Sequence, residues 1–366
     1  MLTHSFDAPR FGSTPSWAEI LGRETTTHRP ILIPGVAGRR VLVTGAGGFI
    51  GSEMARVFAA SGAAEIVLLE IAERALFEVD RNLSAEGFGE RTVPVLGSLC
   101  DRALLASVFE EHRPEIVLHA AALKHVPLME RNPFAAVETN ALGTWGLARI
   151  AADHVVRKMI LVSTDKAAAP HSIMGASKRI AELAMLPYAG FAAVRLVNVI
   201  GSPGSVAPLF AEQIAQGGPV TVTHPAAQRY FFTLDEAVGQ LAEAVAVDGA
   251  RGVLVPEPGE PVVIADLAQW MIAASGRDVP IVFSQLRPGD KLEEALVAPP
   301  ERCRGRVTAG LRSIVGPSAA DLETRISALE TAIVARDLPQ LLRLVEHLVP
   351  DYEPSALLRD AVCASR

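Results

Sequence analysis

The chain has 366 residues, of which 49% are hydrophobic and 20% charged, and its formal net charge is −7. This composition excludes a disordered chain, which would hold fewer apolar and more charged residues. The mild negative charge, without a dense basic cluster, also argues against a nucleic acid as partner.

Short apolar strands alternate with helical segments between residues 41 and 199. Strands are predicted at 41–44, 65–70, 93–96, 116–120, 159–163 and 193–199. Helices are predicted at 50–60, 75–83, 103–111, 138–153 and 175–186. Strands that are apolar throughout are typical of a parallel sheet covered by helices on both faces. The predicted fold class is therefore α/β, with a Rossmann-type doubly wound parallel sheet.

The rest of the chain is expected to form three further parts. Residues 1–38 have mixed polarity and no clear period, and we predict an arm there. Because prolines recur after residue 200, residues 201–350 are expected to form mainly a smaller substrate-binding lobe, with some return to the domain at 39–200. An amphipathic helix in two pieces, broken at Pro339, is predicted over 319–349, and 351–366 are expected to be a tail.

A glycine-rich loop follows the first strand, with glycines at Gly45, Gly48 and Gly51. Such glycines allow a tight turn, close approach to a pyrophosphate and close packing of helix on strand, while the helix N-terminus presents unpaired N–H groups. Glu70 ends the next strand roughly 20 residues after Gly51, where a carboxylate can meet ribose hydroxyls. We predict a dinucleotide site. Glu70 favours NAD over NADP because it would repel a 2′-phosphate, although Arg74 is close enough to oppose this.

The fifth strand ends in Thr164, Asp165 and Lys166, and a helix containing Met174 and Lys178 follows. Ligands of doubly wound sheets bind at the carboxyl ends of strands, so these side chains should face the cofactor. Short-chain dehydrogenases usually have a tyrosine where Met174 stands, four residues before the lysine on the same helix face. A thioether cannot abstract a proton, so either the protein is inactive or another group is the base. An adjacent Asp-Lys pair is usually a surface ion pair, but at this strand end we favour a catalytic role.

The chain resembles the extended short-chain dehydrogenases/reductases that modify nucleotide sugars, and within them the CapD-like UDP-N-acetylglucosamine 4,6-dehydratases. The resemblance covers roughly residues 18–352. Its most specific segments are HAAALKHVPLMERNPFAAVETNALGT (119–144), VSTDKAAAPHSIMGASKRIAE (162–182), GSPGSVAPLF (201–210), GGPVTVTHP (217–225), RYFFT (229–233) and LRPGDKLEE (286–294). Many members of this group have Met in place of the tyrosine, so Met174 is a mark of the subfamily.

The resemblance implies a cycle of internal oxidation and reduction with NAD as cofactor and a UDP-sugar as substrate. Hydride leaves sugar C4, water is eliminated across C5 and C6, and the hydride returns to C6, which gives a 4-keto-6-deoxy sugar nucleotide. Thr164 would take the tyrosine's place at the C4 hydroxyl, Asp165 would protonate the departing C6 hydroxyl and Lys166 would remove the C5 proton. Lys178 would hold the nicotinamide ribose, and a homo-oligomer, a dimer or larger, is expected.

The remaining binding residues lie in the loops around this strand end. Further cofactor contacts are assigned to Phe49, Ile50, Ser98, Leu99, Ala120, Ala121, Ala122, Lys124 and Asn140. Substrate contacts are assigned to Lys124, Asn198, Ser205, Thr221, Val222, Arg229 and Arg287, with the two arginines on the diphosphate. Glu293 and Glu294 are interpreted as a solvated helix face. Ser98, Ala169, Val197 and Asp290 depart from the usual Asp, Asn, Gly and Glu of the family. Ser98 is at a position that meets the adenine of the cofactor, whereas Ala169 and Val197 are expected near the sugar, which leaves the exact sugar open.

Two other classes of function stay in view. A 4-epimerase or 4-oxidoreductase on the same fold would usually keep the tyrosine and lack the Asp-Lys pair. A non-enzymatic cofactor-sensing protein would leave the strand end without reactive groups.

The cysteines and the apolar runs bear on the cellular setting. Cys100, Cys303 and Cys363 lie far apart without metal-ligand spacing, so we expect reduced thiols and no metal site. No apolar run of about 18 residues and no signal-peptide pattern occurs, so we expect a cytoplasmic protein without a membrane span, like the shorter, soluble members of the family.

Overall fold

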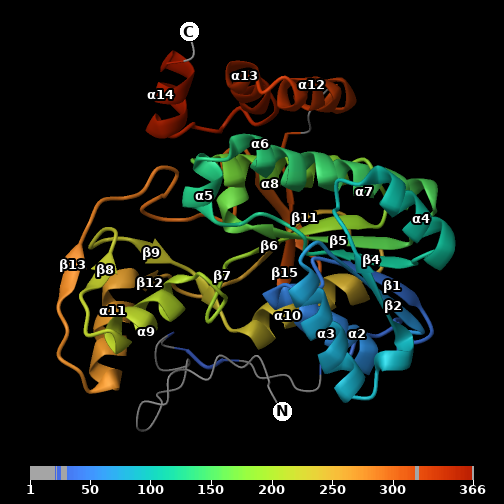
Figure 1. The fold of residues 1–366 in the computed structure, drawn as a ribbon, viewed down its shortest axis with the longest axis horizontal. Helices are drawn as coiled ribbons and strands as arrows, with labels where there is room; N and C mark the ends of the chain where they lie inside the picture. Colours follow the sequence, from blue (N-terminus) through green and yellow to red (C-terminus); the bar gives the residue numbers. More distant parts are fainter. Residues whose placement is uncertain (1–20, 22, 26–30, 318–320, 365–366) are drawn as a thin grey trace.

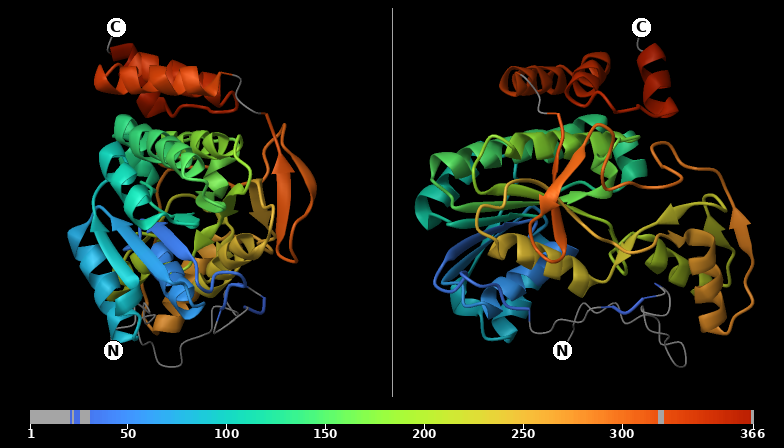
Figure 2. Two further views of the ribbon diagram at one scale, coloured as in Figure 1. Left: turned by 90° about the vertical axis from the view of Figure 1, so that its right-hand side faces the viewer. Right: turned by 180° about the vertical axis from the view of Figure 1, so that it is seen from behind.

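A nine-stranded sheet forms the centre of the structure, a computed structural model that describes residues 21, 23–25, 31–317 and 321–364. The strand order is β14-β15-β11-β6-β5-β4-β1-β2-β3 (Figures 1 and 2). The strands are β1 (Arg40–Thr44), β2 (Glu65–Glu70), β3 (Thr92–Leu96), β4 (Ile116–His119), β5 (Lys158–Thr164), β6 (Phe191–Leu196), β11 (Gly252–Pro256), β14 (Arg302–Arg306) and β15 (Leu311–Val315). From β3 to β11 all neighbours are parallel, whereas β15 is antiparallel to β11 and β14. The order β3-β2-β1-β4-β5-β6 confirms the predicted doubly wound α/β fold.

Helices cover both faces of this sheet (Figure 1). One face carries α2 (Phe49–Ala60), α3 (Glu73–Ala85) and α10 (Leu234–Ala246). The other carries α4 (Arg102–His112), α5 (Val126–Glu130), α6 (Pro133–Ala136), α7 (Gly143–Asp153) and α8 (Ile173–Met185). Three short segments adopt other helix types. They are the 3-10 turns η1 (Gly89–Arg91) and η3 (Asp165–Ala167), and the π-helical segment η2 (Val137–Leu142).

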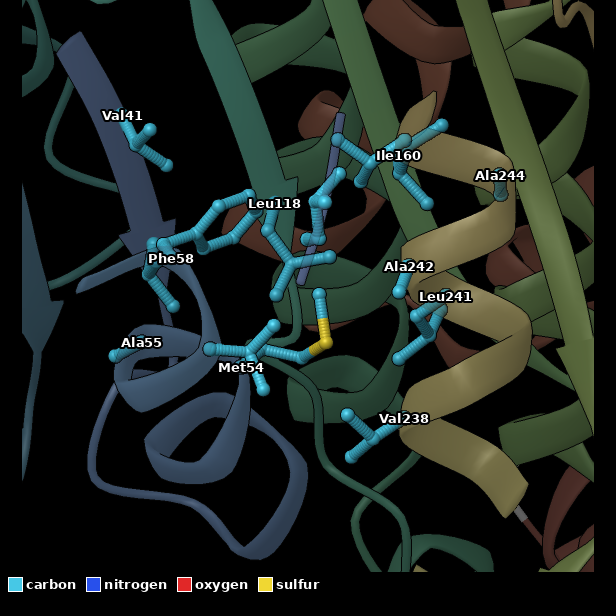
Figure 3. Close-up of a cluster of buried hydrophobic side chains, with 14 of the residues drawn as sticks. Val41, Met54, Ala55, Phe58, Leu118, Ile160, Val238, Leu241, Ala242 and Ala244 are labelled. Carbon is cyan, nitrogen blue, oxygen red and sulfur yellow. The ribbon is translucent and has the colours of Figure 1, made fainter. Parts of the chain in front are cut away.

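The side chains of the central strands are buried alternately in two separate cores. Figure 3 shows one of these cores, where Val41, Leu118 and Ile160 of the strands meet Met54 and Phe58 of α2 and aliphatic side chains of α10. Their neighbours along the strands, such as Leu42, Val117 and Leu161, pack on the opposite face against α4, α7 and α8. Each fully buried side chain of this size contributes about 1.5–3 kcal/mol, which explains why the strand sequences are apolar throughout.

A smaller lobe lies beside the carboxyl ends of these strands (Figure 1). It contains α9 (Val206–Ala215), α11 (Ile264–Ser275) and three two-stranded pairs with a core of their own. The pairs are β7 (Asn198–Val199) with β10 (Phe231–Phe232), β8 (Val220–Val222) with β13 (Ile281–Phe283), and β9 (Gln228–Arg229) with β12 (Val262–Val263). The chain after residue 201 also supplies α10, β11, β14 and β15 to the main sheet and its layers.

The end of the described chain forms helices over the α6 and α8 layer (Figures 1 and 2). They are α12 (Leu322–Val334), α13 (Leu338–Leu348) and α14 (Ala356–Ala364). The predicted break at Pro339 is wrong by a few residues, because the chain leaves α12 at Ala335 and Pro339 lies in the first turn of α13. A proline is tolerated there because its missing N–H would have no partner inside the helix, and Asp337 caps the same turn.

The predicted arm at 1–38 lies mostly outside the described residues. Within the described part, Leu21 packs in the core of the lobe, and Arg23 forms an ion pair with Glu236 of α10. Across the described residues no helix is both long and apolar enough to span a membrane.

Candidate active site

The glycine loop between β1 and α2 requires glycine for steric reasons. Gly45 has φ +66°, and a Cβ atom on it would lie 2.6 Å from the backbone nitrogen of Ala121 in the loop after β4. A Cβ atom on Gly51 would lie 2.0 Å from the carbonyl oxygen of Gly45. Gly48 is the N-cap of α2 and no side chain caps the helix, so Phe49 and the next residues present a bare N-terminus. This is the geometry that receives an anionic group such as a pyrophosphate.

Glu70 lies at the carboxyl end of β2, beside the glycine loop. Its Oε2 accepts a hydrogen bond from the Gly47 backbone N–H at 3.1 Å, and its Oε1 accepts from those of Ile71 and Ala72. Arg74 is 90% exposed and pairs with Glu78 one turn along α3. Arg74, the basic residue that opposed the predicted preference for NAD over NADP, is therefore paired with the carboxylate of Glu78.

The loop after β4 is held by Asn140. Its side-chain Oδ1 accepts from the Leu123 backbone N–H at 2.8 Å, and its Nδ2 donates to the Leu123 carbonyl and to Ser177 Oγ of α8. Asn140 lies in the π-helical turn η2, so the continuous helix predicted over 138–153 is wrong at its start. Such π turns are frequently found at functional sites because the extra residue re-aims a side chain.

The other residues assigned to the cofactor lie in the loops after β3 and β4. Ala120 and Ala121 follow β4, and their backbone N–H groups donate to the carbonyl and the hydroxyl of Thr44. Ala122 is the next residue of this loop, and Lys124 Nζ donates to the Pro203 carbonyl at 3.1 Å while burial lowers its pKa. After β3, Ser98 Oγ accepts from the Cys100 N–H, and Leu99 is buried in a core.

His119, at the end of β4, is a site-adjacent residue that the sequence analysis missed. Thr144 Oγ1 donates to the Asn140 carbonyl at 2.6 Å, so it must accept its 2.9 Å hydrogen bond from His119 Nε2. Nδ1 is then the unprotonated nitrogen and accepts from Thr44 Oγ1 at 2.7 Å. Burial and, secondarily, the nearby Lys178 charge lower the pKa of His119 well below its usual value. A neutral imidazole therefore links β1, β4 and α7.

The strand end of β5 brings Thr164, Asp165 and Lys166 together. Thr164 Oγ1 donates to Asp165 Oδ1 at 3.0 Å, and the same Oδ1 accepts from Lys166 Nζ at 3.0 Å. Asp165 is fully buried, and within the described part of the chain its other oxygen, Oδ2, has no hydrogen-bond partner. A buried oxygen without a partner points to a missing ligand group or a proton.

Glu294 is the second residue that the sequence analysis missed. Its interpretation as a solvated helix face is wrong, because Glu294 is only 8% exposed and lies in a loop; the neighbouring Glu293 is exposed. Glu294 Oε1 is 3.5 Å from Lys166 Nζ, and Asn198 Oδ1 accepts from the same Nζ at 3.2 Å. Burial alone would lower the pKa of Lys166, but Asp165 and Glu294 outweigh it and raise that pKa.

Met174 and Lys178 lie one turn apart in the first half of α8, and both side chains are buried. Met174 packs in the apolar cluster between α5, α8 and the C-terminal helices. Burial lowers the pKa of Lys178 to about 8, with Glu182 acting in the opposite sense. Among the described residues the ammonium of Lys178 has no hydrogen-bond partner, so a ligand can take its N–H groups.

The residues assigned to the substrate fall into two groups. Asn198 contacts Lys166, and Ser205 is the N-cap of α9 with a buried Oγ that no described residue bonds. Arg287 is 55% exposed and pairs with Asp290, so its guanidinium faces solvent beside the lobe. Of these three, Arg287 is the one whose exposure leaves its side chain open to a ligand.

The second group is engaged inside the lobe. The backbone N–H of Thr221 donates to Gln213 Oε1, and the carbonyl of Val222 accepts from Ser284 N–H, while the Val222 side chain is buried. Arg229 donates to the carbonyls of residues 228, 291 and 292. Its guanidinium therefore stabilises a loop, and the expectation that it binds a diphosphate does not fit this geometry.

Residues 41–309 match the family described as polysaccharide biosynthesis protein. The chain belongs to this family. It is 43% identical over 291 residues to the capsular polysaccharide biosynthesis protein CapD of Staphylococcus aureus, and 42% identical over 290 residues to the probable polysaccharide biosynthesis protein EpsC of Bacillus subtilis. Each match covers 76% of this chain and 48% of the relative, so this chain spans about half the length of the curated relatives it matches. The expected CapD-like resemblance is confirmed.

Solved structures show the same fold. The dTDP-glucose 4,6-dehydratase DesIV of Streptomyces venezuelae, with NAD and DAU bound, aligns with a TM-score of 0.62 at 25% identity. The alignment covers 70% of this chain and 88% of DesIV.

Proposed function

We propose that the chain is an NAD-dependent nucleotide-sugar 4,6-dehydratase that converts UDP-N-acetylglucosamine to a UDP-4-keto-6-deoxy-hexosamine. The observation that carries the proposal is the Thr164, Asp165 and Lys166 cluster at the end of β5, together with Met174 at the tyrosine position. An acid and a base on adjacent residues suit an elimination across adjacent carbons. The 4,6-dehydratase DesIV supports the same reaction class, and the CapD relative supports a place in polysaccharide biosynthesis.

The residues present fit a nicotinamide dinucleotide. The bare N-terminus of α2 suits the pyrophosphate, Glu70 suits the adenosine ribose, and the unpartnered Lys178 suits the nicotinamide ribose. When bound, the cofactor would accept hydride from sugar C4 and later return it at C6. Since Arg74 is paired with Glu78, the carboxylate of Glu70 favours NAD over NADP.

The elimination needs Asp165 protonated and Lys166 neutral at the same time. In the structure the two groups share one hydrogen bond of 3.0 Å between Nζ and Oδ1. Transfer of a single proton along this bond converts the ion pair into the acid and base that the reaction needs, without exchange with solvent. Asp165 can then protonate the departing C6 hydroxyl, while Lys166 takes the proton from C5. Oxidation at C4 also releases the proton of the C4 hydroxyl; Thr164 hydrogen-bonds to this hydroxyl and, because its side chain is partly exposed, passes the proton to solvent.

The nucleotide half of the substrate has two candidate anchors. The unpartnered Ser205 Oγ lies at the N-terminus of α9, where oxygen anions are favoured. Arg287 offers a forked set of donors for the diphosphate. The backbone around Thr221 and Val222 forms the adjoining edge of the lobe and is the proposed site of the uracil ring. The pairing of two protomers through surface helices also remains a proposal.

The test is incubation of the chain with NAD and UDP-N-acetylglucosamine in deuterium oxide, followed by mass spectrometry. Loss of one water with one deuterium at C5 is expected. Asp165→Asn and Lys166→Ala should each abolish this product, whereas Asp278→Asn, which changes an exposed aspartate of the lobe, should not. An isomer without loss of water would favour a 4-epimerase, and a panel of nucleotide sugars would then identify the substrate.

A further inference from the structure

A carboxylate from the lobe reaches into the catalytic strand end. Glu294 belongs to the loop between β13 and β14, here called the 284–301 loop, and it is separated from Lys166 by more than a hundred residues of sequence. In Figure 1 this loop, drawn in orange, leaves β13 and passes beside α5. Glu294 Oε1 nevertheless lies 3.5 Å from Lys166 Nζ.

Hydrogen bonds to backbone carbonyls hold this part of the loop from two sides. From the lobe, Arg229 donates to the carbonyls of Lys291 and Leu292, and the Leu292 carbonyl also accepts from the backbone N–H of residue 228. From the catalytic side, Lys291 Nζ donates to the carbonyl of Ala168 at 2.7 Å, directly after η3. The position of the Glu294 carboxylate is therefore set by the same contacts that join the lobe to the catalytic segment.

The charges around Lys166 come from three elements. Asp165 faces it from its own segment, and Glu294 faces it from the 284–301 loop. Two further cations contact Glu294: Lys291 Nζ lies 3.5 Å from its Oε2, and Arg229 Nε lies 3.8 Å from Oε1, the oxygen that faces Lys166. Asn198 supplies a neutral acceptor. Glu294 is thus the only carboxylate among the described residues, apart from Asp165, that forms an ion pair with Lys166.

We propose that Glu294 is a positioning residue, whose carboxylate holds the Lys166 ammonium between Asp165 and Asn198 and retains its proton in the resting site. Its consequence for turnover rests on the proposed function. If the Asp165–Lys166 pair works with one shared proton, activity falls at the alkaline pH where that proton is lost. A second carboxylate beside Lys166 delays this loss, so it extends the active range upward.

The effect can be measured on Lys166 itself, without turnover. The 366-residue chain is labelled with trace amounts of isotopic acetic anhydride over a series of pH values, and the Lys166 peptide is quantified by mass spectrometry. In Glu294→Gln the midpoint of Lys166 reactivity should move down by at least about one pH unit, because an opposite charge within about 4–6 Å shifts such a group by roughly that much. Glu293→Gln, which removes the exposed neighbouring carboxylate, should leave the midpoint in place. An unchanged midpoint in Glu294→Gln would overturn the proposal.

Two further measurements separate positioning from folding and from the proposed function. Glu294→Asp keeps the charge, so its midpoint should return most of the way to that of the unmodified chain; a midpoint as low as that of Glu294→Gln would count against an electrostatic role. The alkaline limb of kcat for water loss should shift with the labelling midpoint, whereas a merely structural defect would lower kcat at every pH. If the unmodified chain releases no water from any nucleotide sugar, the proposed function fails, and the labelling result still decides the role of Glu294.

Discussion

Replacement of Glu182 by glutamine should show how strongly a buried ion cluster fastens α8 to the central sheet. Glu182 is fully buried; its Oε1 accepts from Ser163 Oγ at 2.7 Å and Arg195 Nε at 2.8 Å, and its Oε2 accepts from Arg195 and Arg179 at 2.8 Å and 2.9 Å. Burial alone would raise the pKa of Glu182, but Arg195 and then Arg179 overcome it and lower that pKa from 4.5 to about 2. A difference of about 2.5 units corresponds to about 3 kcal/mol of folding free energy at neutral pH.

The loss of one partner from a buried pair independently suggests a cost of about 3–5 kcal/mol. Because Arg195 keeps Glu301 as a second partner, at 2.7 Å, we expect the lower end, about 3 kcal/mol. Urea unfolding at pH 7 measures this cost as a lower midpoint at unchanged slope. Glu323→Gln is the matched control, since it breaks an exposed pair with Arg149 and should cost less than about 1 kcal/mol.

The same variant carries a pH signature. A carboxylate whose folded pKa is depressed contributes its stability above pH 4.5, and this contribution is lost as the pH falls toward 2. Glu182→Gln should therefore lose less stability than the unmodified chain between pH 5 and pH 3. A cost below about 1 kcal/mol at pH 7, or an unchanged acid dependence, would refute the electrostatic reasoning.

Three further predictions concern the cofactor loop, Lys178 and Ala169. Gly51→Ala should abolish NAD binding in a fluorescence titration, because its Cβ would lie 2.0 Å from the Gly45 carbonyl oxygen, whereas Gly146→Ala in α7 meets no atom within 4 Å and should bind normally. Lys178→Met should end turnover but raise the unfolding free energy at pH 7 by up to about 3 kcal/mol. The reason is that burial lowers the pKa of Lys178 to about 8, so the charged lysine costs folding stability at every pH below that value. Equal or lower stability of the variant would contradict this. Ala169 has φ +41°, so Ala169→Gly should raise the unfolding free energy by about 0.5–1 kcal/mol, measured by urea unfolding, and a destabilised variant would show that the local strain was misjudged.

The main sheet could be predicted because its strands are both apolar and short. Side chains such as Leu42 and Val43 are buried on opposite faces, so the polar residues of β1, Arg40 and Thr44, are confined to its ends and the apolar run between them is visible in the sequence. The predicted strand at 65–70 agrees with β2, those at 41–44, 93–96 and 116–120 differ from β1, β3 and β4 by one residue at one end, and that at 159–163 is one residue short at each end of β5. The strand predicted at 193–199 is wrong at both ends, because β6 spans Phe191–Leu196 and Asn198–Val199 form the separate strand β7, which pairs with β10. By contrast, β14 has the sequence RCRGR with all residues exposed, so its pairing with β15 leaves no apolar pattern to find.

The site could be predicted only where its residues are neighbours in the chain. Thr164, Asp165 and Lys166 follow one strand, so the rule that ligands bind at strand ends was enough to group them. Glu294 reaches the same cluster through the fold of the 284–301 loop, and next to Glu293 it has no local pattern that marks it as buried. Arg229 likewise donates to the carbonyls of Lys291 and Leu292 because the fold places the 284–301 loop beside it. An arginine in the sequence does not indicate which backbone segment it will contact.

The most direct test of the central claim follows one hydrogen through the reaction. UDP-N-acetylglucosamine labelled with deuterium at C4 is incubated with the chain and NAD, and the product is analysed by mass spectrometry and proton NMR. The proposed dehydratase predicts a product that has lost one water and carries the deuterium at C6 of the same sugar. A product that keeps its mass and retains deuterium at C4, or one from which the deuterium has passed to the free cofactor, would contradict it.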